Sequence, residues 1–169
     1  MTSPETVIFV SLGSNIEPEQ NLRAAVRLLR EWCDVLAVSS AYRTAPQRYT
    51  EQADFLNLAV KLTTAFDPAG FKSKVIVRIE GELKRVRDPQ NKNAPRTIDL
   101  DISLWGGSVI EYGDKPWRVP DKDILRFAHV AIPLAEIAPE YVHPEDGRRL
   151  KDIAAQFDHE GIERMSLDL

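Results

Sequence analysis

The stretch that decides the fold is Arg96-Thr97-Ile98-Asp99-Leu100-Asp101-Ile102, in which apolar and polar residues alternate. A period of two is typical of a strand that is buried on one face only. The apolar row of this predicted strand is Ile98, Leu100, Ile102 and Leu104. The polar row is Asp99, Asp101 and Ser103, with Thr97 and Trp105 at its ends. Alternate residues of a strand lie about 6.5–7 Å apart, so we expect both carboxylates to open onto the same patch.

Two aspartates side by side on a strand need an explanation, because like charges repel and Asp is disfavoured in strands. A divalent cation between the carboxylates would relieve the repulsion. Arg96, three residues before Asp99, would also relieve it. The alternative is a solvated antiparallel strand without a ligand. The stretch by itself leaves these interpretations open.

Length and composition restrict the class of protein. The 169 residues, 43% of them apolar, predict a single domain over residues 1–169 with a substantial core. A net charge of −4 provides no sequence-wide basic field for nucleic acid. The single cysteine, Cys33, rules out an internal disulfide and fits a reducing compartment. With no signal-peptide pattern and no long apolar run, we expect a cytoplasmic protein that does not enter a membrane.

Hydrophobic periodicity predicts the order of the elements. Strands are expected at residues 7–12, 35–44, 55–63 and 98–104, with 109–112 as the return strand of a hairpin. Residues 13–15 are expected to form a turn and residues 116–122 an irregular segment. Helices are expected from Pro18, from Pro68 to about Arg87, at 133–138 and at 150–157. The order β-α-β-β-α-β favours an α+β fold, a ferredoxin-like antiparallel or mixed sheet with helices packed on one face.

Basic residues precede the aspartate strand. They are Lys84, Arg85, Arg87, Lys92 and Arg96. Cations gather at helix C-termini to match the dipole, which accounts for the first three but not for Arg96. Carboxylates beside cations suit phosphoryl transfer, in which carboxylates hold Mg²⁺ and arginines neutralise phosphate charge. The sequence has no P-loop, no zinc-site histidine spacing and no serine-hydrolase elbow, so any ATP site here lacks a P-loop.

Residues 92–102 closely resemble the signature of the 6-hydroxymethyl-7,8-dihydropterin pyrophosphokinase family. Other segments resemble the family in the same order: residues 12–15, 42–44 with 55–57, 78–87 and 133–139. The resemblance covers roughly residues 5–150. It implies that diphosphate passes from ATP to the hydroxymethyl group of the pterin, with release of AMP, in folate biosynthesis.

The resemblance also implies roles for individual residues. Asp99 and Asp101 would bind two Mg²⁺ ions together with ATP. The catalytic set would be Arg85, Arg96, Asp99 and Asp101, and the nucleotide side would comprise Glu80, Arg85, Arg87, Arg96 and Ile102. The pterin would be held by Thr44, Ala45, Phe55, Asn57, Asp99 and Phe127. ATP and the pterin are the expected partners, with no nucleic acid and no membrane, and the chain is expected to be a monomer or weak homodimer.

The sequence departs from the family pattern at four places. Asp121 stands where the family has a histidine after Val119 and Pro120, and Ser103 replaces an aliphatic residue. Asn93 stands where the family commonly has an aromatic residue, and residues 126–129 stand where it has Arg-x-Phe. The pattern leaves open whether Phe127 or His129 covers the second face of the pterin. Two alternative functions remain: a non-catalytic ferredoxin-like module that binds nucleic acid or a ligand, and an Asp-x-Asp transferase that uses nucleotide sugars.

Overall fold

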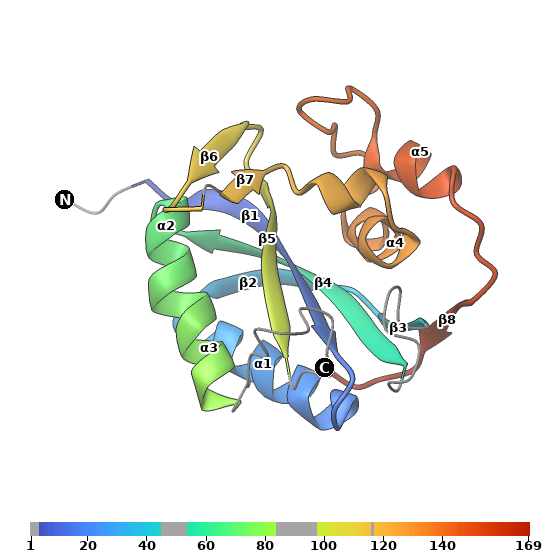
Figure 1. The fold of residues 1–169 in the computed structure, drawn as a ribbon, viewed down its shortest axis with the longest axis horizontal. Helices are drawn as coiled ribbons and strands as arrows, with labels where there is room; N and C mark the ends of the chain where they lie inside the picture. Colours follow the sequence, from blue (N-terminus) through green and yellow to red (C-terminus); the bar gives the residue numbers. More distant parts are fainter. Residues whose placement is uncertain (1–3, 45–53, 84–97, 116) are drawn as a thin grey trace.

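The computed structural model describes residues 4–44, 54–83, 98–115 and 117–169. Within these residues a six-stranded antiparallel sheet has the order β5-β1-β4-β3-β8, and β2 also pairs with β4 (Figure 1). Its strands are β1 (Thr6–Ser14), β2 (Asp34–Val38), β3 (Ala41–Thr44), β4 (Phe55–Thr64), β5 (Asp99–Trp105) and β8 (Ile162–Met165). Strand β4, for which alternation was predicted, thus pairs with β1 in the middle of the sheet, and the aspartate strand β5 pairs with the other side of β1.

The two long helical segments follow the strands from which they were expected to cross over. Helix α1 (Pro18–Trp32) buries the predicted stripe of Leu22, Val26 and Leu29. The second segment comprises α2 (Pro68–Phe71), a π-helical turn η1 (Lys72–Ile76) and α3 (Val77–Glu82). The Asp67 carboxylate caps its start by accepting a hydrogen bond of 2.7 Å from the Gly70 N–H. Its expected end near Arg87 lies outside the described residues.

Helices cover both faces of the sheet. The long segments α1 and α2–α3 pack on one face, as predicted, against Ile8, Val10 and Leu12. On the other face, α4 (Ala128–Ile137) lies over the sheet and α5 (Leu150–Ala155) packs on α4 (Figure 1). Phe9 and Ala59 belong to the apolar cluster on this face. The prediction of helices on one face therefore describes the long segments alone. Among the described residues, those that cluster with α4 and α5 include Phe9 and Ala59 but not Gly13, Asn57 or Asp99.

Several predicted boundaries were wrong. Helix α4 begins at Ala128, because burial of Val130 and Ala131 supports a turn before Pro133, which lies inside the helix. The predicted strand 35–44 divides into β2 and β3 at Ser39, whose Oγ accepts a hydrogen bond of 2.8 Å from the Ala59 N–H. Gly13 belongs to β1 rather than to a turn.

The segment after β5 also differs from the prediction. Strand β6 (Ile110–Tyr112) pairs with β7 (Trp117–Val119) in a separate two-stranded sheet, not with β5. A 3₁₀ turn, η2 (Lys122–Leu125), follows β7. The segment expected to be irregular thus contains a strand, and β8 at the C-terminal end was not predicted. No helix in the described part of the chain is long and apolar enough to cross a membrane.

A bulge in β5 changes which way its last residues point. Opposite β1, Val10 pairs with Ile102 but Phe9 pairs with Leu104, so Ser103 is an extra residue. Leu104 consequently joins Phe9 under α4, and Trp105 packs on the other face. The prediction that Leu104 shares a face with Leu100 was wrong, because one inserted residue exchanges the two faces.

Candidate functional site

The candidate site lies on the part of the second sheet face beside α4. Register aligns three residues there across three strands: Gly13 of β1 is opposite Asn57 of β4 on one side and Asp99 of β5 on the other. Two residues earlier in β1, Ser11 is opposite Asp101 of β5. Asp99 is half-buried and Asp101 is exposed. The structure therefore brings both aspartates onto the face that also carries Asn57.

Strand β3 contributes a polar side chain, Thr44, to this face. The Asn57 Nδ2 donates a hydrogen bond of 2.9 Å to the Oγ1 of Thr44, a buried residue at the end of β3. Thr44 is in turn opposite Phe55 in the ladder, and Phe55 is half-buried. The bond fixes the Asn57 amide while leaving it a second N–H and a carbonyl oxygen. Such a group can read the edge of a planar heterocycle, and Phe55 can offer a ring face.

Residues 121–129 are attached to β5 at its bulge. The Asp121 N–H donates to the Ser103 carbonyl at 2.9 Å, and the Asp121 carboxylate accepts from the Asp123 N–H at 2.9 Å. Asp121 thereby caps η2, which is a structural reason for an acidic residue at this position. The segment then continues into α4.

Phe127 and His129 face one another at the start of α4. Their rings stack with centroids 5.2 Å apart, and the Arg126 guanidinium lies 5.4 Å from the Phe127 ring centre. Burial lowers the pKa of His129, which favours its neutral form. The sequence left these residues as alternatives for one role. The structure joins them in a single aromatic pair.

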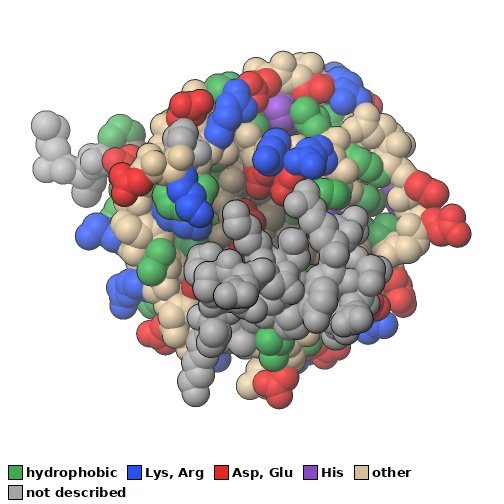
Figure 2. Space-filling view, viewed as in Figure 1, with side chains coloured by type: hydrophobic (Ala, Val, Ile, Leu, Met, Phe, Trp, Pro, Cys, Tyr) green, Lys and Arg blue, Asp and Glu red, His purple; other side chains and the backbone are tan. Residues whose placement is uncertain are grey.

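The electrostatics of the site are acidic. Burial raises the pKa of Asp121 to about 6, and the carboxylates of Asp123 and Asp99 contribute to the rise against the opposing Asp123 N–H. Burial likewise raises the pKa of Tyr112 to about 12, with further contributions from Asp101 and Asp121. Acidic side chains lie in a hollow over β5, beside basic ones (Figure 2). The described carboxylates thus lie close enough to influence one another, and Tyr112 is a neighbour that no sequence pattern indicated.

The donor set around Asp99 and Asp101 suits a hard divalent cation. Among the residues that the structure describes, no group of three or more His, Cys, Asp or Glu side chains could hold a metal ion. Carboxylate oxygens are nevertheless ligands that Mg²⁺ accepts, and Mg²⁺ commonly takes the rest from water and substrate phosphates. The two aspartates therefore fit a metal that arrives with a phosphorylated substrate.

The remaining predicted residues fall into two groups. Ala45, Arg85, Arg87 and Arg96 lie outside the described residues. Glu80 is buried on α3, and Ile102 packs in the core on the face opposite Asp101. Strand alternation turns the Ile102 side chain inward, and its place on the nucleotide side stays a prediction.

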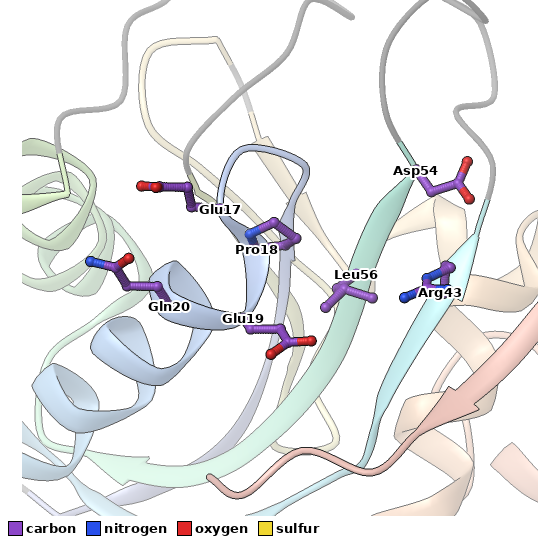
Figure 3. A pocket seen from close by; sticks show the side chains of 7 residues that line it. All are labelled: Glu17, Pro18, Glu19, Gln20, Arg43, Asp54 and Leu56. Atoms are coloured by element: carbon purple, nitrogen blue, oxygen red, sulfur yellow. The ribbon is translucent and has the colours of Figure 1, made fainter.

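A separate cavity of about 440 Å³ lies at the start of α1 (Figure 3). Its lining comprises Glu17, Pro18, Glu19, Gln20, Arg43, Asp54 and Leu56. None of the predicted site residues that the structure describes is among them. This cavity is therefore distinct from the row of Asn57, Gly13 and Asp99.

Comparison with known proteins identifies close relatives. The family model of 7,8-dihydro-6-hydroxymethylpterin-pyrophosphokinase (HPPK) matches residues 9–139. The 2-amino-4-hydroxy-6-hydroxymethyldihydropteridine pyrophosphokinase of Methylorubrum extorquens is 36% identical over 163 residues, which are 95% of this chain and 99% of that protein. The enzyme of the same name from Bacillus subtilis is 36% identical over 92% of this chain and 88% of its own length.

Other relatives are longer proteins. The Dictyostelium discoideum folic acid synthesis protein FOL1 is 32% identical over 82% of this chain, which spans 20% of that protein. The wild-type Plasmodium falciparum HPPK-DHPS crystal structure with pteroate superimposes with a TM-score of 0.80 at 13% identity, over 97% of this chain and 48% of that one. The chain thus spans about half of the Plasmodium protein, and the superposition supports the predicted α+β fold.

Proposed function

Because the chain belongs to the 7,8-dihydro-6-hydroxymethylpterin-pyrophosphokinase family, enzymes of folate synthesis, we propose that it transfers diphosphate from ATP to 6-hydroxymethyl-7,8-dihydropterin and releases AMP. The pterin hydroxymethyl oxygen attacks the β-phosphorus of ATP. The bond from that phosphorus to the oxygen it shares with the α-phosphorus breaks, and AMP leaves. Family membership carries this proposal, and it argues against a non-catalytic binding module and a nucleotide-sugar transferase.

Asp99 and Asp101 hold the metal end of the site in this proposal. Their shared face and the acidic surroundings of Asp121 support a role in binding Mg²⁺, two ions with ATP. Bound Mg²⁺ supplies neutralisation of the charge that develops on the transferred group. Asp99 and Asp101 would hold these ions and so keep the triphosphate on this face of the sheet.

The pterin end is formed by Thr44, Asn57 and Phe55. The Asn57 amide, held by Thr44 at 2.9 Å, supports recognition of the ring edge, and Phe55 contributes a stacking face. Asp99 lies in the same row as Asn57, so it contacts the hydroxymethyl side of the pterin as well as the metal. Phe127 covers the second face of the pterin ring, and His129 stacks on Phe127.

Other parts of the assignment stay predictions. They are the phosphate contacts of Arg85, Arg87 and Arg96, the nucleotide role of Glu80 and the pterin contact of Ala45. Packing of α5 on α4 and pairing of β8 with β3 support a single domain over residues 1–169. A cytoplasmic location fits the single cysteine. A monomeric or weakly dimeric state, and the absence of nucleic-acid and membrane partners, also stay predictions.

The experiment is release of AMP from ATP in the presence of the reduced pterin and Mg²⁺. We expect Asp99→Ala and Asp101→Ala to abolish AMP formation while the unfolding midpoint stays near that of the wild type. Asp34→Ala, which removes an exposed carboxylate from β2 in the same sheet, is the matched control and keeps full activity. AMP release at the wild-type rate from either site variant would contradict the assignment of Asp99 and Asp101 as metal ligands.

A further inference from the structure

Gly13 occupies the centre of the row formed by Asn57, Gly13 and Asp99. It lies inside β1 and is not among the glycines with positive φ, so its backbone conformation is open to any residue. Space is what limits this position. A Cβ atom added there would lie 2.9 Å from the Asn57 Oδ1, closer than real side-chain contacts. It would also lie 3.9 Å from the Phe55 ring.

The Asn57 amide occupies the space that a side chain on Gly13 would fill. Its Nδ2 end is bound to Thr44 on β3, and its Oδ1 end lies over β1 at Gly13. The amide therefore extends across the sheet from β3 toward the strand that borders β5. A side chain at position 13 would push the Oδ1 away and rotate the amide, because the planar group cannot move one end alone.

We propose that Gly13 is a positioning residue for the pterin: its missing side chain lets the Asn57 amide lie over β1, one strand away from Asp99, where it meets the edge of a planar heterocycle. The inference rests on the proposed function and deepens it. Gly13 contacts neither ATP nor the metal in this assignment and acts through Asn57. The effect of a substitution should consequently be confined to the pterin.

The test is Gly13→Ala, assayed by AMP release with each substrate varied in turn. We expect KM for the pterin to rise about tenfold, the equivalent of one lost hydrogen bond, and KM for ATP to stay within about twofold. Gly107→Ala is the matched control, because a Cβ there meets nothing within 4 Å. It should leave both KM values unchanged. An unchanged pterin KM in Gly13→Ala would overturn the inference.

A second test, made in the Asn57→Ala variant, separates loss of amide positioning from general damage to the fold. Asn57→Ala removes the atom that the new Cβ would meet, so adding Gly13→Ala to it should change the pterin KM by less than about twofold. This double variant also lacks the steric conflict if Gly13→Ala alone fails to fold. A full tenfold further rise in that background would show that Gly13 does not act through Asn57.

NMR gives a readout that needs no turnover. The Asn57 side-chain amide resonances should shift in ligand-free Gly13→Ala and stay in place in Gly107→Ala. Unshifted resonances in Gly13→Ala would contradict the inference. If the wild type releases no AMP, the proposed function fails; if it does and Gly13→Ala matches it in pterin KM, only this inference fails.

Discussion

The Tyr42 hydroxyl donates a hydrogen bond of 2.5 Å to the Glu136 Oε1 and so connects β3 to α4 across the second sheet face. The other carboxylate oxygen of Glu136 accepts from the Ser40 N–H at 2.7 Å. Arg164 of β8 lies 3.8 Å from the Oε1 and donates to the Ser40 Oγ at 2.9 Å. One carboxylate thus holds together α4, β8 and the start of β3, the strand that ends at Thr44 in the site.

Tyr42→Phe tests this connection. The variant should lower the free energy of unfolding by about 1.5–3 kcal/mol, the range for a hydrogen bond to a charged group. Tyr141→Phe is the control, because in the described part of the chain the buried Tyr141 hydroxyl has no hydrogen-bond partner. Removing that hydroxyl should leave stability unchanged or raise it. Urea denaturation measures both, and equal losses would refute the distinction.

The hydroxyls of Ser11 and Ser103 lie 2.5 Å apart at the bulge of β5. Replacing either serine by alanine leaves the other hydroxyl without its partner in a largely buried place, which should cost about 1 kcal/mol. The double alanine variant removes both polar groups and should cost less than the sum of the single variants. A double-variant cycle in unfolding free energy checks this, and strict additivity would argue against coupling.

Asp121 makes stability depend on pH in the metal-free protein. Its pKa is raised from 3.8 to about 6, so the folded state holds the proton more tightly than the unfolded state. The stabilisation that Asp121 gives the folded state is therefore fully present below pH 3.8 and is lost as the pH rises through about 6. Asp121→Asn keeps an acceptor for the Asp123 N–H but carries no charge.

We expect Asp121→Asn to lack this loss and to be more stable than the wild type at pH 7, by at most about 3 kcal/mol. Unfolding free energies measured from pH 4 to pH 8 without Mg²⁺ would display the difference. Parallel profiles for the two proteins would mean that Asp121 does not titrate in this range.

The roles of the stacked rings of Phe127 and His129 can be distinguished by mutation. Phe127→Ala should raise KM for the pterin and leave KM for ATP unchanged, because it removes the ring proposed to cover the substrate. His129→Ala should have a smaller effect of the same kind, since His129 supports the Phe127 ring from 5.2 Å. Steady-state kinetics with each substrate varied decides the order. A larger effect from His129→Ala would transfer the covering role to that ring.

The local sequence pattern was sufficient to predict much of the fold and to select the candidate site residues. The alternation of residues 98–102 and 55–62 predicted both strands and their polar faces, because a period of two is a property of the strand itself. The prolines Pro18 and Pro68 located the starts of the long helical segments for the same local reason. The segments that resemble the family identified the aspartates before any contact was known.

Tertiary structure alone decided which of these faces meet. Strand register, set by pairing between distant segments, aligned Gly13 with Asn57 and Asp99 and turned a predicted loop glycine into the centre of the row. The bulge at Ser103, the pairing of β6 with β7 and the addition of β8 likewise depend on long-range contacts. The amino-acid sequence by itself determined the residue types and, before the bulge in β5, their faces. Only packing decided their neighbours, because the free energy of a strand pair comes from its partner strand.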